Sequence, residues 1–465
     1  MSTSNIGDAA HTHGFRRLIL LAATAGLWFT GTAIAQVLYS DGASHTIPGD
    51  PAFSNGQSVW LSSASSLNIL SGATVTGPAA LSNQPMIGGF GILASDGTAI
   101  AQTGGAVTGG AGTVIADGAS PPTVLAAGGL AVATSGTYAG TGGSITGGLA
   151  TAEANIGSIQ TEGGLGLYLN NATSAALAGT TLTGGDANSG KNSVGSAYEV
   201  LATGGAALRV GNGGPTTINS GSFTGGNGWA ESNTVGFGSA TGTGGVAVDV
   251  RGTANVTING GNFQGGIGSG LVNLSNAPGV GVGGGALRVQ GPSTVTINGG
   301  AFTVGSSSAG TIPPTTPLTT AQSAVTVVGD ELSGQFTLAI HSGTFTGLHA
   351  IETTGASPNL TVARIDITGG TLQASSGQTV IELANPNVLT SLIGSNFALN
   401  GLPLSPGLVS ETQGTLTGTL ASGSTFSWSF HRANNAPLQV AAVPEPMSGV
   451  LAASSILLLW RVGRR

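Results

Sequence analysis

The sequence predicts an all-β protein whose chain coils as a right-handed parallel β-helix. The first observation is a repeat, because residues 204–226, 244–266 and 283–303 are related copies that begin 40 and 39 residues apart. The second is that each copy holds two short runs in which apolar and polar residues alternate, which is typical of strands. The third is size, since a unit this small cannot bury its apolar face alone and must stack on its neighbours.

The repeat predicts columns of equivalent side chains along the coil. The expected inner columns are Phe223, Phe263 and Phe302; Val210, Val250 and Val289; and Ile218, Ile258 and Ile297. A column of Asn219, Asn259 and Asn298 is expected at a turn, where asparagine tolerates left-handed backbone and its amides can bond from rung to rung.

One outward column alternates in charge, because Arg209, Asp249 and Arg288 occupy the same position of the three copies. We interpret these side chains as exposed ion pairs that support the register. On that interpretation Asp249→Asn costs only on the order of 0–1 kcal/mol of stability.

Weaker copies of the repeat begin at Gly88, Gly128 and Gly163, so the coil is expected to span residues 88–387. The Gly-Gly pairs that open the copies are interpreted as turns, since no helix follows that would make them phosphate loops. Beyond residue 323 the spacing shortens to 26 and 30 residues, which indicates a rung without an insertion.

The extra length of the 40-residue repeats lies in residues 186–203, 227–243, 267–282 and 304–323. We interpret these segments as loops on one face that are dispensable for folding. They carry Tyr198, Trp229 and Phe237 as candidate glycan contacts. The alternative is that these aromatic side chains only cover the edge of the coil.

Composition excludes several classes of protein. Of 465 residues 83 are glycine, but without the three-residue period of collagen, and only 6% are charged, unlike a charge-rich disordered chain. The absence of cysteine excludes disulfides, thiolate metal sites and a cysteine nucleophile. The single lysine, Lys191, and the lack of a basic patch argue against nucleic acid as a partner.

The first 35 residues have the pattern of a secretory signal peptide. Arg16 and Arg17 precede an apolar run at residues 18–29, and Ala33 and Ala35 form a small-residue cleavage site before Gln36. The run is short for a membrane-spanning helix. Without residues 1–35 and 445–465, Lys and Arg fall from 11 to 6 and Asp and Glu from 18 to 16, so the net charge is −10. Such an acidic, Gly- and Ser-rich body suits an extracellular setting.

The chain is therefore divided into six parts. These are a signal peptide (1–35), an N-terminal cap with the first strands (36–87), the coil (88–387), C-terminal strands that cap it (388–430), a linker (431–442) and a tail (443–465). Within the cap, residues 415–430 read as two strands around a turn at 421–423 that cover the open end of the coil.

The tail has three parts in order. Val443, Pro444, Glu445 and Pro446 are followed by an uncharged apolar run at 447–460 and then by Arg461, Arg464 and Arg465. As a helix the run is about 21 Å long, short of a hydrocarbon core of about 30 Å. This order resembles the PEP-CTERM sorting signal of Gram-negative bacteria, over residues 443–465 only. The resemblance implies a short hydrophobic helix as a transient inner-membrane anchor, cleavage by an exosortase, and export linked to exopolysaccharide. A plain C-terminal membrane anchor is the alternative.

The sequence contains few residues suited to catalysis. Asp249, Glu352, Asp366 and Glu382 fall on predicted strands, mostly on different rungs, and Arg364 is expected to pair with Asp366. His341 and His349 have no acidic partner in their motifs, which argues against a metal site. We therefore expect a secreted, non-enzymatic surface or extracellular-matrix protein without a cofactor, associated with extracellular polysaccharide, biofilm or adhesion. The alternative is a lyase or glycosidase on the same coil, which needs a cluster of acids on one stripe.

Overall fold

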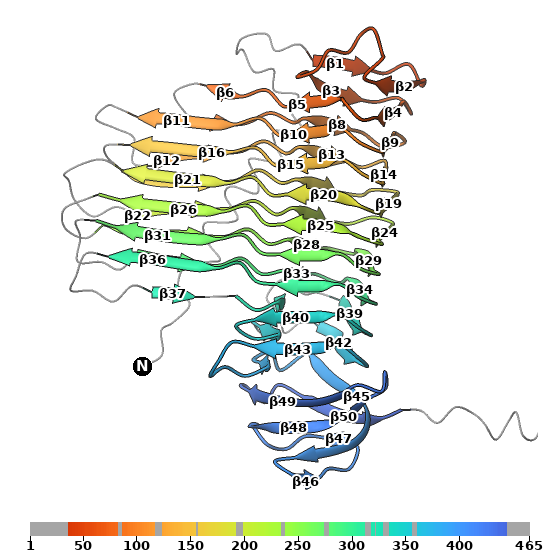
Figure 1. The fold of residues 1–465 in the computed structure, drawn as a ribbon, viewed down its shortest axis with the longest axis vertical. Helices are drawn as coiled ribbons and strands as arrows, with labels where there is room; N and C mark the ends of the chain where they lie inside the picture. Colours follow the sequence, from red (N-terminus) through yellow and green to blue (C-terminus); the bar gives the residue numbers. More distant parts are fainter. Residues whose placement is uncertain are drawn as a thin grey trace, which may run out of the picture. The chain divides into compact units, whose positions relative to one another are not determined.

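The computed structural model describes residues 36–81, 86–116, 123–154, 157–191, 199–233, 238–273, 279–311, 318–320, 322–328, 334–355 and 360–443. Within these ranges the chain is all-β, without a helix, and most strands pair in parallel with the equivalent strand of the next rung. This is the arrangement of a β-solenoid (Figure 1). The predicted signal helix and C-terminal hydrophobic helix lie outside the described residues.

Three ladders of strands form the coil. The first contains β1 (Gln36–Tyr39), β3 (Ser58–Leu61), β8 (Ile92–Ala94), β13 (Val132–Thr134), β18 (Leu167–Leu169), β23 (Leu208–Val210), β28 (Val248–Arg251), β33 (Leu287–Gln290), β38 (Val325–Val328), β41 (Ile351–Thr354), β44 (Ile381–Leu383) and β49 (Thr425–Arg432). The second contains β2 (Ser44–Ile47), β4 (Ser66–Ile69), β9 (Ala99–Gln102), β14 (Thr137–Gly140), β19 (Ser174–Leu177), β24 (Pro215–Ile218), β29 (Asn255–Ile258), β34 (Thr294–Ile297), β39 (Gly334–Ile340), β42 (Leu360–Ile367), β45 (Leu389–Leu399) and β50 (Leu438–Ala442). The third contains β5 (Thr74–Thr76), β10 (Ala106–Thr108), β15 (Ser144–Thr146), β20 (Thr180–Thr183), β25 (Gly221–Thr224), β30 (Asn262–Gln264), β35 (Ala301–Thr303), β40 (Thr344–Gly347) and β43 (Thr371–Ala374).

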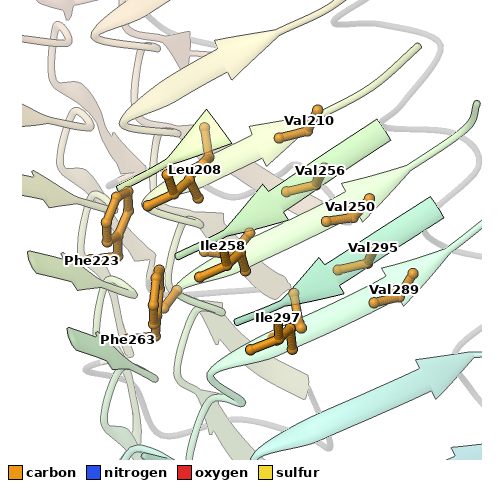
Figure 2. Packing of buried hydrophobic residues seen from close by; sticks show 14 of the residues in the cluster. Leu208, Val210, Phe223, Val250, Val256, Ile258, Phe263, Val289, Val295 and Ile297 are labelled. Carbon is orange, nitrogen blue, oxygen red and sulfur yellow. The ribbon is translucent and has the colours of Figure 1, made fainter. Parts of the chain in front are cut away.

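The predicted inner columns are confirmed. Val210, Val250 and Val289 are aligned in the first ladder, and Ile218, Ile258 and Ile297 in the second, all of them buried. Figure 2 shows Val210, Val250 and Val289 one above another in the interior, and Ile258 above Ile297. Since neighbouring parallel strands lie about 4.8 Å apart, each buried side chain is packed against its own equivalents.

The aromatic column is longer than predicted, because Phe345 of β40 extends the row of Phe223, Phe263 and Phe302. The ring centroids of successive members lie 4.9, 4.6 and 4.7 Å apart, with interplanar angles of 19°, 13° and 9°. Leu182 and Leu372 occupy the same position on the flanking rungs. The column is therefore a continuous apolar stack inside the third ladder.

The segments predicted as loops form two further parallel sheets, so that prediction is wrong. The outgoing side sheet contains β6 (Ala80–Leu81), β11 (Gly112–Ala116), β16 (Ala150–Ala154), β21 (Ala187–Lys191), β26 (Gly228–Ser232), β31 (Gly268–Val272) and β36 (Ser307–Thr311). The returning side sheet contains β7 (Met86–Ile87), β12 (Thr123–Ala127), β17 (Ser158–Glu162), β22 (Glu199–Thr203), β27 (Ser239–Thr243), β32 (Gly279–Val282) and β37 (Leu318–Thr320). In Figure 1 the strands of these two sheets run out from the coil between β6 and β37. Residues 227–243 are thus not a loop, because they supply β26 and β27, which are paired on both sides within the side sheets; that they are dispensable for folding stays a prediction.

The two side sheets are not evident from a hydrophobicity pattern because most of their inward residues are small. Ala202, Ala230 and Ala240 are fully buried between them. A Cβ placed on Gly242 would come within 1.9 Å of the Ser269 carbonyl oxygen, and one on Gly268 within 1.8 Å of the Val282 oxygen. Main chain therefore contacts main chain here, closer than the spacing of about 10 Å at which sheets usually pack.

The Gly-Gly pairs are not turns, so the interpretation of these pairs as turn residues is wrong. The second glycine of each pair lies where the outgoing and returning chains pass one another, and its N–H donates to the carbonyl of the preceding crossing; Gly305, which follows Val304, occupies the same position. For example, Gly226 N–H donates to Gly205 O at 2.8 Å, and Gly245 N–H donates to Gly226 O at 2.7 Å. We call this row the glycine neck; its members are Gly89, Gly110, Gly129, Gly148, Gly164, Gly185, Gly205, Gly226, Gly245, Gly266, Gly284 and Gly305. None of them has a positive φ, so glycine is required by close approach and not by left-handed backbone.

The asparagine column is confirmed as a hydrogen-bonded ladder. The Nδ2 of Asn259 donates to Oδ1 of Asn219, and the Nδ2 of Asn298 donates to Oδ1 of Asn259, both at 2.8 Å. These asparagines do not have left-handed backbone, which instead falls on Gly261 and Gly300 at φ of 123° and 114°. The turn is therefore at the predicted place, but the left-handed backbone is adopted by a glycine that follows the asparagine and not by the asparagine itself.

Both ends of the coil follow the sequence pattern with one exception. Residues 59–69 and 74–76 contribute to the first complete rung, and residues 415–430 fall in the antiparallel hairpin of β48 (Gln413–Leu420) and β49, beside the short β46 (Leu402–Pro403) and β47 (Gly407–Leu408). The exception is residues 431–442, assigned to a linker. They contain the end of β49 and all of β50, which pairs in parallel with β45. Alternation at Leu438 and Val440, both buried, is the signal that this segment is strand.

Candidate functional site

Trp229 is the one candidate glycan contact that falls within the described residues; Tyr198 and Phe237 lie outside them. It belongs to β26, whose residues Gly228, Ala230 and Ser232 point between the side sheets. The intervening residues, Trp229 and Glu231, therefore point outward. The Trp229 side chain is 51% exposed on a paired sheet and not on a loop.

A shallow pocket of about 240 Å³ surrounds this tryptophan. Its lining residues come from three neighbouring strands: Thr151, Ala152, Glu153, Asn188, Ser189, Gly190, Trp229 and Glu231. Gly190 lies in register between Glu153 and Glu231. Because glycine has no side chain, the column is open at that rung, and the two carboxylates stand on either side of the gap.

The two carboxylates differ in their surroundings. Glu231 is half-buried, and its Oε1 accepts hydrogen bonds from Nδ2 of Asn233 at 3.3 Å and of Asn273 at 2.8 Å. Glu153 is exposed. An aromatic platform beside fixed amide and carboxylate groups can stack on a sugar ring and accept hydrogen bonds from its hydroxyls.

Sequence reasoning found Trp229 but missed the acids beside it. Glu153 and Glu231 are 78 positions apart in the sequence, and they face one another only because β16, β21 and β26 are consecutive in one sheet. The alignment of the repeats could have placed Glu153 and Glu231 in one column. It would have done so only if the inserted segments had been interpreted as strands.

The charged column of the first ladder is not exposed, so its interpretation as exposed surface pairs is wrong. Asp249 is 0% exposed and accepts hydrogen bonds from three guanidinium groups, two of which the sequence predicted. Arg209 Nε lies 2.9 Å, Arg251 Nε 2.6 Å and Arg288 Nη2 3.1 Å from its Oδ2, and Arg288 Nε lies 3.1 Å from Oδ1. We call these four residues the arginine cluster. Arg251, two positions after Asp249 on the same strand face, is the member that the repeat did not reveal.

The arginines determine the charge state of the buried carboxyl. Burial by itself would raise the pKa of Asp249, but the guanidiniums of Arg288, Arg251 and Arg209 outweigh burial and hold that pKa far below its ordinary value. The carboxylate therefore remains ionised, and its contribution to stability is present above pH 3.8 and is lost only as the pH falls through the lower folded-state pKa.

We expect Asp249→Asn to cost about 3 kcal/mol, because it removes the charge of a buried carboxylate that three guanidiniums share. This is the lower end of the range for breaking a buried ion pair, since the arginine side chains are 20–30% exposed and partly solvated. Urea unfolding at neutral pH measures it, with Asp366→Asn as the control on a more exposed pair. A cost below about 1 kcal/mol for Asp249→Asn would contradict this prediction, because it is the value expected of exposed surface ion pairs.

Further along the same outward column two acids are neighbours. Glu352 and Glu382 are in register on adjacent rungs, where the sequence suggested no stripe of acids. Ser323 Oγ donates to Glu352 at 2.7 Å, Thr379 Oγ1 donates to Glu382 at 2.8 Å, and His431 pairs with Glu382. The predicted pair of Arg364 with Asp366 is confirmed.

The two histidines considered as metal ligands, His341 and His349, instead form hydrogen bonds with a hydroxyl and a carbonyl group. His341 Nδ1 lies 2.8 Å from Thr368 Oγ1, and His349 Nδ1 lies 2.7 Å from the Thr379 carbonyl oxygen. Across the ranges that the structure describes, no group of three or more His, Cys, Asp or Glu side chains is arranged to hold a metal ion.

The proposed processing sites lie at the ends of the described chain. Gln36 begins β1 and Val443 is the last described residue. Ala33, Ala35, Pro444, Glu445, Pro446, Arg461, Arg464 and Arg465 lie outside the described residues. Between residues 36 and 443, where described, no helix is long and apolar enough to cross a membrane. Comparison with known proteins adds no relative, since no family model, no curated protein and no solved structure matches this chain.

Proposed function

We propose that this chain is an exported, non-enzymatic surface or extracellular-matrix protein that binds extracellular polysaccharide through the outer face of its outgoing side sheet. The observation that carries this proposal is the half-exposed Trp229 in a pocket with Glu153 and Glu231, all on paired strands. A rigid sheet positions these groups without an ordering cost on binding. A right-handed sense of the coil stays a prediction.

Trp229→Ala is expected to weaken binding to the responsive polysaccharide at least about tenfold, because a central tryptophan is commonly a binding hot spot. The measurement is a glycan-array screen with the full-length chain, followed by titration of the best responders. Trp60→Ala is the matched control, since Trp60 is 40% exposed on β3, outside the pocket. Equal binding by wild type and Trp229→Ala, or equal losses in both variants, would contradict the proposal.

An enzyme that acts on polysaccharide is the second candidate, and the same pocket favours it. Glu153 and Glu231 stand two strand spacings apart, about 9.6 Å along the coil. Inverting glycosidases separate their carboxyl groups by about 6.5–9.5 Å. If polysaccharide added in the titration is shortened, and Glu153→Gln and Glu231→Gln each abolish the shortening, the enzymatic function replaces the non-enzymatic one.

We further propose that residues 443–465 direct sorting by an exosortase. The apolar run 447–460 would hold the exported body at the inner membrane of a Gram-negative bacterium, while Arg461, Arg464 and Arg465 resist translocation. A span this short is a poor permanent anchor because hydrophobic mismatch carries a cost. Pro444 and Pro446 disfavour helix and keep the cleavage segment extended. Final release places the protein at the cell surface or in the extracellular matrix.

Mass spectrometry of the protein from its native host tests the sorting proposal. We expect an N-terminus at Gln36 and a C-terminus near Pro444, Glu445 and Pro446. Replacing Pro444, Glu445 and Pro446 by alanine should leave the uncut form in the inner membrane. Mature surface protein that still ends at Arg465 would instead establish a plain membrane anchor.

A further inference from the structure

Threonine dominates the outward face of the third ladder. Each of its nine strands presents two outward side chains, one on either side of a buried residue, and the strands pair without a register shift. The first outward column is Thr74, Ala106, Ser144, Thr181, Ser222, Asn262, Ala301, Thr344 and Thr371. The second is Thr76, Thr108, Thr146, Thr183, Thr224, Gln264, Thr303, Thr346 and Gln373. We call these two columns the threonine face; none of its members is charged or buried.

The repetition of the coil does not by itself produce such a face. The outward column of the first ladder runs in register from Trp60 through Arg209 to Glu382. The outward positions of the second ladder include Pro215 and Asp366. All three ladders belong to the same rungs, but only the third keeps one kind of short, uncharged side chain from end to end. Its outer face is therefore suited to a regular, uncharged surface.

The threonine face is also nearly flat. Directly beneath it, the rings of Phe223, Phe263, Phe302 and Phe345 lie 4.9, 4.6 and 4.7 Å apart and are inclined to one another by only 19°, 13° and 9°. Neighbouring strands of ordinary sheets are rotated by about 20–25°. The outward side chains are thus spaced about 4.8 Å apart from strand to strand and about 6.6 Å apart along a strand.

The hydroxyl groups of the second column are available to water. Within the described structure they form no hydrogen bond to another protein atom, apart from Thr346 Oγ1, which donates to Gln373 Oε1 at 3.5 Å. Each such hydroxyl can donate one hydrogen bond and accept two. The branched Cβ of threonine restricts rotation of the side chain, so the hydroxyls are held in place before any ligand arrives.

The spacing of this array is close to that of ordered water. In a tetrahedral network with O–H···O distances of about 2.75 Å, two oxygens that share a neighbour lie about 4.5 Å apart, and the network repeats along its hexagonal axis after about 7.3 Å. The threonine face matches both spacings to within about a tenth. We infer that the threonine face binds ice, with its hydroxyls in the places of water oxygens at the crystal surface and its methyl groups between them.

Crystalline water fits this face better than a sugar polymer. The two columns contain no aromatic ring on which a sugar could stack and no charged group for an acidic chain. A single hydroxyl contributes little because it exchanges one hydrogen bond to water for another. Many weak contacts bind firmly when they act together, and a crystal surface meets all nine strands at once. The inference does not depend on the Trp229 pocket, which lies on the outgoing side sheet.

The test measures how much of the full-length chain enters a slowly growing ice crystal, with neutral dextran in the same solution as the excluded solute. We expect the wild-type chain to be enriched in the ice relative to dextran and to give the crystals facets. Exclusion of the chain to the same degree as dextran would overturn the inference. Adsorption to microcrystalline cellulose together with exclusion from ice would also overturn it and give the face to a sugar polymer.

A protruding side chain locates the binding. Thr183→Tyr places a ring above the plane of the face near its centre, which separates the neighbouring rungs from the ice and should lower the enrichment at least about tenfold. Thr257→Tyr is the matched control, since Thr257 points outward from β29 of the second ladder, in register with Thr217 and Thr296. It should leave the enrichment unchanged. Equal enrichment of the wild type and the Thr183→Tyr protein, or equal losses in both variants, would contradict the inference.

A second variant covers the case in which Thr183→Tyr does not fold. Thr303→Tyr makes the same change on β35, three rungs further along the face, and should lower the enrichment to the same degree. Far-ultraviolet circular dichroism checks the fold of each variant. Trp229→Ala should keep its enrichment in ice, so failure of this inference and of the proposed polysaccharide binding can be told apart. Loss of enrichment in Trp229→Ala but not in folded Thr303→Tyr would place the ice contact elsewhere and overturn the inference.

Discussion

Gly245→Ala is expected to cost at least about 4 kcal/mol of the free energy of unfolding, well above the usual effect of adding one methyl group. A Cβ on Gly245 would stand 2.0 Å from the Gly205 carbonyl oxygen and 2.8 Å from that of Gly204. Neither atom can rotate away, because each belongs to hydrogen-bonded main chain. Gly245 is itself bonded on both sides, to Gly226 and Gly266, so a shift would break the row in both directions.

The control for that variant is Gly190→Ala. It measures the effect of replacing a strand glycine by alanine outside the glycine neck. A Cβ on Gly190 meets only Glu153 Cγ, at 3.9 Å, and its backbone conformation suits any residue. We expect a change within about 0.5 kcal/mol. Urea unfolding followed by far-ultraviolet circular dichroism measures both variants. Similar midpoints for the two would show that the outgoing and returning chains do not touch at Gly245.

Phe263→Ala is the second large effect, at about 3–5 kcal/mol. The ring lies between Phe223 and Phe302 and is 1% exposed, so its removal leaves a cavity within a continuous stack. The cavity cannot close easily, because the register of β25, β30 and β35 keeps the strands at their spacing.

Leucine is the natural control at this position, since Leu182 and Leu372 end the same column. Phe263→Leu keeps an apolar branched side chain and should cost less than about 1.5 kcal/mol. Differential scanning calorimetry of the two variants gives the comparison. A Phe263→Ala protein as stable as Phe263→Leu would mean that the cavity closes at little cost, which would contradict the prediction.

The sequence by itself determined the coil, because aligning the copies of the repeat shows which residues of successive rungs are in register. Residues 39 or 40 apart carry the same side chain, and equal side chains on successive rungs must stack if the unit is to bury its apolar face. The columns that contain Phe263, Val250 and Ile258 were predictable for this reason, as was the amide ladder at Asn259. Trp229 could also be singled out, because a large aromatic is conspicuous in a Gly- and Ser-rich segment.

Only the tertiary structure decided which chains meet across the coil. The pairs at Gly205 and Gly245 look like turn residues until the outgoing chain is seen to pass the returning one at hydrogen-bond distance. Most inward residues of the side sheets are Gly, Ala and Ser, whose alternation with outward residues is faint because small residues differ little in hydrophobicity. The burial of Asp249 and the meeting of Glu153 with Glu231 depend on neighbours from other rungs. Local alternation specifies a strand and its faces, but whether an outward residue meets water or protein depends on a segment elsewhere in the chain.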